Sequence, residues 1–268
     1  MTKPIIISVI NQKGGVGKTT LTLNLGAALA RRGHKILLID ADLQANLTQS
    51  TIGQHEGEGL AECLIEESGL DEVITATREP NLFLVPASDL MVEVDLQLAS
   101  KIGRERVLSN CLDATKKLDQ FDYILIDNPP YFSLVTLNTL TASDYYLVPV
   151  SAAYLSLVGI RLLEQNIEKL TKSLKLPLKC LGVVLTMYDL REKITKQVEE
   201  VLQETIGDKL LVNKIRVNTN YKSAPIEQQT IFELEKTASR KTGTEDFTGL
   251  ASEVKVRIIN QQDRVANG

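Results

Sequence analysis

Short apolar runs alternate with longer amphipathic stretches along most of the chain. The short runs are apolar at nearly every position and rich in β-branched residues, which is typical of parallel strands covered on both faces. The expected strands span residues 4–10, 36–39, 82–85, 123–127, 145–150 and 179–187. This order predicts a sheet whose successive strands are joined by helices.

The stretches between these runs carry apolar residues at helical spacing. Leu21, Leu25, Ala28 and Leu29 share one side of the first stretch, and Gly33 is placed to end it. Helical patterns also cover residues 60–65, most of 87–119, and 156–173. Within 87–119 the expected core positions are Leu90, Val94, Leu98, Val107, Leu108 and Leu112. We predict an α/β fold with a doubly wound, mainly parallel sheet and helices on both faces, forming a single domain over residues 1–268.

The composition is that of a soluble globular protein, with 43% hydrophobic and 24% charged residues. No apolar run reaches the roughly 20 residues that cross a bilayer, and the N-terminus lacks the features of a signal peptide. We therefore expect a cytoplasmic protein with no membrane partner. A net charge of -4 argues against a strongly basic nucleic-acid binder, although a local basic patch is compatible with it.

A glycine-rich segment, residues 13–20, lies between the first expected strand and the first expected helix. Gly14, Gly15 and Gly17 allow backbone N–H groups to surround an anion at the positive end of that helix. Lys18 supplies a cation for the β and γ phosphates, and the hydroxyl of Thr19 is placed to coordinate Mg²⁺. The segment predicts a site for a nucleoside triphosphate.

The segment departs from the general P-loop pattern G-x-x-x-x-G-K-[ST], because Gln12 stands at the first glycine position and Lys13 begins the loop. It resembles the K-G-G-x-G-K-[ST] motif of the ParA/MinD family, the deviant Walker A ATPases. The resemblance implies that ATP is held by the whole loop, Val16 and Thr20 included. It also implies that Lys13 reaches across a dimer interface to the ATP of the other subunit.

Two of the expected strands lead into aspartates at the edge where open α/β sheets bind their ligands. Asp127 ends an apolar run, the Walker B arrangement, and can hold a metal-bound water while Thr19 binds Mg²⁺ directly. The resemblance ties Asp40 to the activation of water. A carboxylate beside a triphosphate is a weak base, so we expect Asp40 to orient the water and turnover to be slow. Asp42 and Gln44 either face the site or cap the turn. The predicted catalytic residues are Lys13, Lys18 and Asp40.

The resemblance continues into the carboxyl-terminal third. Residues 185–191 look like the family's segment beside the adenine, and residues 218–225 resemble its N-x-x-x-x-E-A-P stretch with serine at the glutamate position. Contacts to the nucleotide by Met187, Asn218 and Pro225 are therefore implied. The family also often carries glutamate where this chain has Ala153, so contacts there are not carried over.

Family members of this size bind DNA without sequence preference as ATP-bound dimers. The candidate contacts here are Arg191, Lys193, Lys214, Arg216 and Lys222, with Lys196, Arg240 and Lys241 as further basic residues. The family's Ile-Pro-Arg-Asn is replaced by Ile-Arg-Val-Asn, which moves the arginine one place earlier. A solvated charged face explains these residues almost as well, but phosphate contacts would make affinity fall steeply with salt.

The first hypothesis is a ParA-type positioning ATPase located on the nucleoid. ATP closes a homodimer on DNA, and a ParB-like or cargo-adaptor partner stimulates hydrolysis and release. The cargo classes are plasmids, chromosomes and large protein bodies such as carboxysomes. No helix-turn-helix segment precedes the first expected strand, so specific operator binding is not expected.

Two alternatives remain. A MinD-like membrane ATPase of division-site selection needs a terminal amphipathic helix. Leu250, Val254 and Ile258 have helical spacing, but polar residues 260–263 follow, so we expect a helix packed on the domain. A P-loop synthetase of small-molecule metabolism would need a second substrate pocket, which the sequence does not address.

Overall fold

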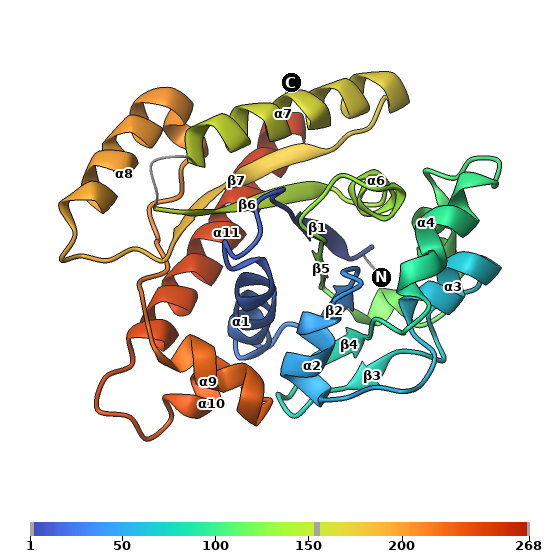
Figure 1. The fold of residues 1–268 in the computed structure, drawn as a ribbon, viewed down its shortest axis with the longest axis horizontal. Helices are drawn as coiled ribbons and strands as arrows, with labels where there is room; N and C mark the ends of the chain where they lie inside the picture. Colours follow the sequence, from blue (N-terminus) through green and yellow to red (C-terminus); the bar gives the residue numbers. More distant parts are fainter. Residues whose placement is uncertain (1–2, 153–155, 267–268) are drawn as a thin grey trace.

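A seven-stranded sheet runs through the centre of the protein (Figure 1). The computed structural model describes residues 3–152 and 156–266, so Ala153 lies outside the described residues. The strands are β1 (Ile5–Val9), β2 (Ile36–Asp40), β3 (Thr75–Ala76), β4 (Leu82–Val85), β5 (Tyr123–Asp127), β6 (Tyr145–Ser151) and β7 (Lys179–Thr186). Their order is β3-β4-β2-β5-β1-β6-β7, and every neighbouring pair is parallel except β3 with β4.

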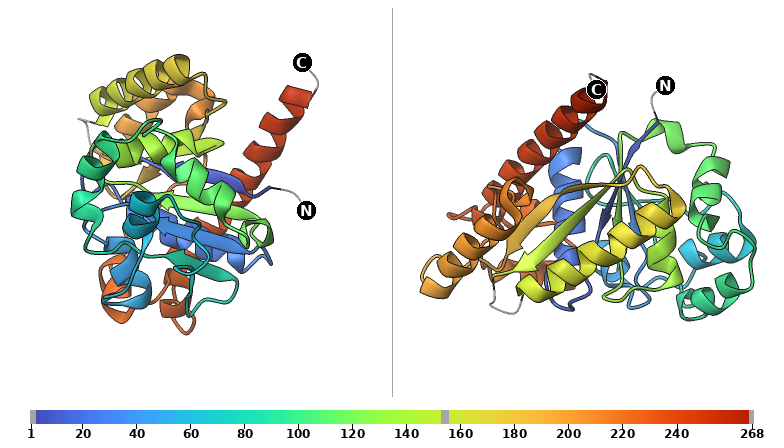
Figure 2. Two further views of the ribbon diagram at one scale, coloured as in Figure 1. Left: turned by 90° about the vertical axis from the view of Figure 1, so that its right-hand side faces the viewer. Right: turned by 90° about the horizontal axis from the view of Figure 1, so that it is seen from above.

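Helices cover both faces of the sheet, as Figure 2 shows. They are α1 (Lys18–Ala30), α2 (Asn46–Ile52), α3 (Leu60–Glu66), α4 (Met91–Ala99), α5 (Val107–Ala114), α6 (Leu134–Thr141), α7 (Ser156–Leu174), α8 (Lys193–Ile206), α9 (Asn220–Glu227), α10 (Ile231–Leu234) and α11 (Thr242–Ala266). Short 3₁₀ helices are η1 (Leu118–Gln120) and η2 (Gly207–Lys209). None of the described helices combines the length and the apolar character that crossing a bilayer requires.

The two faces bury separate sets of strand residues because side chains alternate along each strand. Ile7 and Leu38 share one apolar cluster with α1 and α11, whereas Ile6 and Leu37 share another with α3, α4 and α5. Beyond them, α7 and α8 cover β6 and β7 with a third cluster. The predicted doubly wound, mainly parallel α/β architecture is confirmed.

Most of the predicted core positions and elements are confirmed, although the first strand is one residue shorter at each end than residues 4–10, and the stretch 87–119 is divided between α4 and α5. Leu90 was expected in the core, but 40% of it is exposed, because it precedes α4 and that helix buries Met91, Val94 and Leu98 instead. The last predicted strand ends at Thr186 and excludes Met187, whose φ of 52° is left-handed and ends the extended backbone.

The topology brings three chemically important segments to one edge of the sheet. β5 lies between β2 and β1, and the register pairs Asp127 with both Asp40 and Val9. The glycine loop follows β1 directly. Because parallel strands present their carboxyl ends at the same edge, both aspartates face the loop that precedes α1.

Gly59, before α3, allows a close backbone approach that positions this helix. A Cβ added at Gly59 would lie 2.3 Å from the carbonyl oxygen of Pro86, and that oxygen accepts a hydrogen bond from the N–H of Leu60 at 2.8 Å. We expect Gly59→Ala to lower the free energy of unfolding by about 2 kcal/mol, the scale of overpacking. Chemical denaturation measures this change. Gly159→Ala in α7, where an added Cβ meets nothing within 4 Å, is the control and should be neutral or stabilising. Equal effects of the two substitutions would contradict this reading of Gly59.

Candidate functional site

The loop between β1 and α1 forms an open cradle of backbone N–H groups. Gly15 and Gly17 have φ angles of 72° and 85°, which favour glycine, and a Cβ added at Gly15 would meet no atom within 4 Å. Within the described part of the chain, the N–H groups of Gly15, Gly17, Lys18 and Thr19 donate no hydrogen bond, and no side chain caps α1. Free amides at a helix N-terminus are the arrangement that binds phosphate.

The pair formed by Thr19 and Asp127 has the chemistry of a divalent-cation site. The Thr19 hydroxyl donates to Oδ2 of Asp127 at 2.6 Å, and Asp127 is fully buried. Its other oxygen, Oδ1, has no hydrogen-bond partner among the described residues. Burial, and then the neighbouring carboxyl of Asp40, raise the pKa of Asp127. A hydroxyl beside a buried carboxylate oxygen that has no partner fits a hard cation such as Mg²⁺. The charge of the cation would offset the free-energy cost of ionising Asp127.

Asp40 is held in one orientation by the first half of α2. Its Oδ2 accepts from the N–H and hydroxyl of Thr48 at 2.8 and 2.7 Å, and its Oδ1 accepts from the N–H of Asp42 at 3.2 Å. The Thr48 hydroxyl also accepts from the N–H of Ala87 at 3.0 Å. Burial raises the pKa of Asp40 in spite of these hydrogen bonds.

Lys18 provides the positive charge beside these carboxyl groups. Lys18 is buried at the start of α1 and lines the pocket next to the loop. Burial lowers the pKa of Lys18, while Asp127 and Asp42 oppose that shift. A buried ammonium beside free amides raises the local preference for an anion.

A pocket of about 420 Å³ lies over the loop and collects most of the predicted nucleotide contacts. Of these, it is lined by Gly14, Gly15, Gly17, Lys18, Thr19, Thr20, Met187 and Pro225. Asp42 and Gln44 also line it, and Asp42 caps the turn as well, because its Oδ1 accepts from the N–H of Gln44 at 3.1 Å. Asp40 does not line this pocket and lies buried beside it.

Four predicted contacts do not line this pocket, namely Lys13, Val16, Asp127 and Asn218. Asp127 is fully buried and bonded to Thr19, which does line it. Val16 is buried, and its carbonyl oxygen accepts from the hydroxyl of Thr186 at 2.8 Å, which ties the loop to the end of β7. Asn218 lines an adjoining, mostly apolar cavity of about 330 Å³. Both cavities share Met187 and also Tyr221, which the sequence analysis did not identify. Tyr221 lies within residues 218–225, and nothing in the sequence of that segment indicates that its side chain lines two cavities.

Lys13 is exposed at the start of the loop. Its backbone N–H donates to Oδ1 of Asn11 at 2.9 Å, and its side chain forms no ion pair with any residue that the structure describes. Its ammonium therefore pairs with no acidic group in the described part of its own chain. The exposed side chains of Leu43, Tyr131 and Phe132 come from the loops after β2 and β5, which meet at the same edge.

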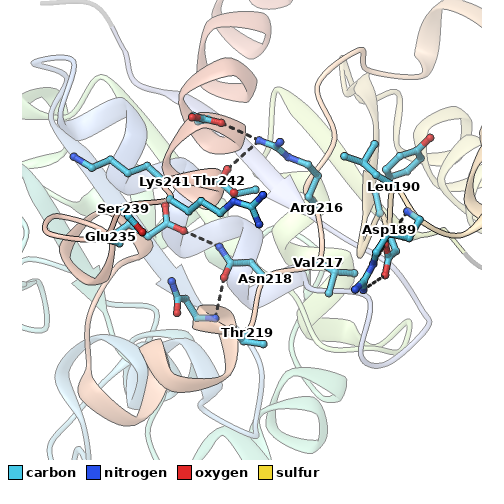
Figure 3. A pocket seen from close by; sticks show the side chains of 16 residues that line it. Asp189, Leu190, Arg216, Val217, Asn218, Thr219, Glu235, Ser239, Lys241 and Thr242 are labelled. Carbon is cyan, nitrogen blue, oxygen red and sulfur yellow. Dashed lines mark hydrogen bonds and ion pairs between the residues drawn. The ribbon is translucent and has the colours of Figure 1, made fainter.

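The predicted basic residues divide into paired and unpaired sets. Arg191 contacts Asp189 at 2.5 Å, Lys214 contacts Glu199, and Arg216 contacts Asp246 at 2.6 Å. Lys193, Lys196 and Lys222 are exposed and form no ion pair within the described residues. Figure 3 shows Arg216 beside a basin of about 870 Å³, with Lys241 among the side chains that line it.

Comparisons with known proteins agree on one family. A family model described as an AAA domain matches residues 4–180. The sporulation initiation inhibitor protein Soj of Bacillus subtilis is 37% identical over 93% of this chain and 97% of its own length. The chromosome partitioning protein ParA of Caulobacter vibrioides is 34% identical over 97% of each chain.

Solved structures show the same fold. Cobyrinic acid a,c-diamide synthase from Mycobacterium smegmatis, with a bound ATP analogue and magnesium, has a TM-score of 0.74 at 29% identity, covering 89% of this chain and 98% of its own. A variant of Cyanothece McdA in complex with ATP has a TM-score of 0.79 at 25% identity, covering 96% of this chain and 97% of its own.

The raised pKa of Asp127 predicts a pH-dependent stability in the absence of metal. A carboxyl whose pKa is raised in the folded state stabilises that state below the unfolded pKa of about 4, and this contribution is lost as pH rises through the folded pKa of about 8. We expect Asp127→Asn to raise the melting temperature relative to wild type by more at pH 8 than at pH 5, measured in EDTA. The exposed Asp119→Asn is the control. A shift that is equal at both pH values would contradict the assigned cause.

Proposed function

The chain belongs to the ParA/MinD family of P-loop ATPases, and we propose that it is a ParA-type ATPase that positions or segregates a cargo through slow, DNA- and partner-stimulated hydrolysis of ATP. The observation that carries this proposal is the free amide cradle of residues 14–19 facing the Thr19–Asp127 pair. That arrangement suits a triphosphate together with its cation.

The roles of the loop residues follow from their positions. The amides of Gly15, Gly17 and Thr19 receive the phosphate oxygens, and Lys18 neutralises the β and γ phosphates. Thr19 and Asp127 would hold Mg²⁺, which when bound supplies charge neutralisation between the β and γ phosphates. The size of the pocket over the loop and its apolar neighbour leaves space for the nucleoside beside Met187.

Asp40 acts on the attacking water by orientation. Thr48 donates two hydrogen bonds to one carboxylate oxygen, so the side chain is fixed before substrate arrives. A fixed weak base next to a triphosphate gives slow turnover. Slow hydrolysis suits a protein whose ATP-bound state must persist for a set time better than it suits a metabolic enzyme.

The exposed lysine at the start of the loop supports an ATP-dependent homodimer. The side chain of Lys13 forms no ion pair among the described residues, and the exposed Leu43, Tyr131 and Phe132 belong to loops at the same edge of the sheet. Aromatic side chains of this kind are enriched at protein interfaces. A second subunit across this edge would receive Lys13 at its own nucleotide and cover these apolar groups.

Non-specific DNA is the proposed surface on which the dimer settles. Lys193 and Lys222 present free charges, while Arg191, Lys214 and Arg216 are candidates whose charges are already paired. The similarity to the chromosome partitioning protein ParA supports a chromosomal cargo, and a plasmid or a large protein body is the proposed alternative. A ParB-like or other adaptor is the proposed partner. We propose a cytoplasmic location on the nucleoid.

The likeness to cobyrinic acid a,c-diamide synthase favours keeping a synthetase as the second candidate. An ATPase rate that is stimulated by DNA without any metabolite would count against it. A MinD-like membrane anchor at α11 is less well supported, because Leu250, Val254 and Ile258 are buried in the cluster shared with α1. Co-sedimentation with liposomes in the presence of ATP tests that alternative.

Removing the free lysine should prevent assembly without preventing nucleotide binding. We expect Lys13→Ala to bind ATP but to stay monomeric with ATP and Mg²⁺, because the charge that reaches the partner's nucleotide is lost. Light scattering coupled to size-exclusion chromatography measures the mass. Lys116→Ala, an exposed lysine on the loop before β5 and thus at the opposite edge, is the control. A dimer of unaltered stability in Lys13→Ala would exclude the proposed role.

The unpaired lysines should determine how DNA binding responds to salt. Each phosphate neutralised by a free cation steepens the dependence of log K on log salt by about 0.9. We expect Lys222→Ala to make this slope shallower by nearly that amount in the ATP state, measured by fluorescence anisotropy with duplex DNA. Lys116→Ala again serves as the control. A binding constant that does not respond to ionic strength would contradict the proposed surface.

A further inference from the structure

The guanidinium of Arg216 is held by the first turn of α11. Its Nε and Nη2 approach Oδ1 of Asp246 at 2.8 and 2.6 Å, and Nη2 lies 3.2 Å from Oε2 of Glu245. The backbone N–H of Arg216 donates to Oδ2 of Asp246 at 2.8 Å, so both oxygens of one carboxylate are occupied. Figure 3 shows Arg216 beside Thr242 at the border of the large basin.

The contact is largely shielded from water. Asp246 has a side chain only 7% exposed, and that of Arg216 is 32% exposed. Ion pairs of this geometry, with charge-assisted hydrogen bonds and partial burial, are stronger than pairs on an open surface. Arg216 is therefore less available to an external phosphate than its place in a basic stretch of the sequence indicates.

The backbone on either side of Arg216 is fixed as well, and we call residues 215–218 the strap. Ile215 donates to the carbonyl of Leu185 at 2.8 Å and accepts from the N–H of Tyr188 at 3.0 Å. At the other end, the amide of Asn218 donates to Glu235 at 2.7 Å, and the same carboxylate accepts from the N–H groups that begin α11. The strap thus joins the end of β7 to α11.

The strap also forms a wall of the apolar cavity beside the glycine loop. That cavity is lined by residues 215–218 together with Gly17 and Met187. Met187 has a left-handed backbone, a conformation that a non-glycine residue adopts rarely, and it follows Thr186, which is bonded to the loop carbonyl of Val16. A ligand in this cavity therefore touches the segment that carries Arg216.

We propose that the carboxylates of Asp246 and Glu245 withhold Arg216 from DNA phosphates, so that Arg216 contributes to DNA binding only when the strap moves away from the first turn of α11. This inference rests on the proposed binding of DNA and assigns its regulation. A DNA phosphate that binds a paired arginine only replaces the carboxylate already bound to it, so the exchange adds little binding free energy. Arg240 and Lys241, which line the same basin and form no ion pair among the described residues, carry no such restraint.

The test compares DNA binding of nucleotide-free variants at low salt by fluorescence anisotropy with a labelled duplex. We expect Asp246→Asn to bind about fivefold more tightly than wild type, with a salt slope steeper by about 0.9, because one more cation reaches a phosphate. Glu204→Gln, which removes an equal charge from an exposed position on α8, is the control and should leave the slope unchanged. The double variant Asp246→Asn with Arg216→Gln should lose the gain and match Arg216→Gln alone.

We call the hold of Asp246 and Glu245 on Arg216 the clamp, and the outcomes separate it from general repulsion of DNA by acidic residues. A gain that persists in the double variant would show that Asp246 merely repels DNA and would overturn the proposal, as would a gain of the same size in Glu204→Gln. If Asp246→Asn fails to fold by circular dichroism, Glu245→Gln carries the same comparison with a smaller expected gain. Wild type that stays unbound even with ATP and Mg²⁺, while Asp246→Asn binds through Arg216, would support the clamp and contradict the proposed function.

Discussion

Two buried carboxyl groups lie next to each other at the carboxyl ends of β2 and β5, and the surrounding structure is arranged to tolerate them. Asp40 and Asp127 are register partners and are both fully buried, so burial raises the cost of ionising each of them, and the carboxyl of Asp40 raises that of Asp127 further. Lys18, the hydroxyls of Thr19 and Thr48, and the free amides before α1 offset part of that cost. The part of the ionisation cost that remains favours binding of a cation by the carboxylates, while the free amides favour an anion. A metal-bound triphosphate has this charge pattern.

Hydrogen bonds connect the glycine loop of this site to segments that are distant in the sequence. The glycine loop is anchored to β7 through the hydroxyl of Thr186, and β7 leads by way of Met187 into the bonds that hold the strap. The strap in turn is joined to α11 directly by Arg216, and by Asn218 through the carboxylate of Glu235. A change at the phosphate loop therefore meets a path of hydrogen bonds and connecting backbone that ends at Arg216 and α11. Such a path can couple the glycine loop to Arg216 when one of its contacts, such as Arg216 with Asp246, has two arrangements.

The fold was largely predictable because strand and helix periodicities were strong and consistent with one another. The apolar runs located six of the strands, and the glycine segment with its two strand-ending aspartates located the site. Leu90 was misplaced because helical spacing alone does not show where a helix begins. β3 is two residues long and antiparallel, and so short an element leaves no periodic signal. The pairing of Arg216 with Asp246 joins residues far apart in sequence, and a basic stretch free of local acids gave no warning of it.

The central claim is that Thr19 and Asp127 hold a divalent cation against a triphosphate in the cradle of loop amides. Electron paramagnetic resonance with Mn²⁺ as a stand-in for Mg²⁺ tests it most directly, in the presence of a non-hydrolysable ATP analogue. The account predicts tight uptake of one ion per chain that depends on the nucleotide and is weakened by Asp127→Asn. Uptake of the same strength without nucleotide, or with the Asp127 carboxylate removed, would contradict it.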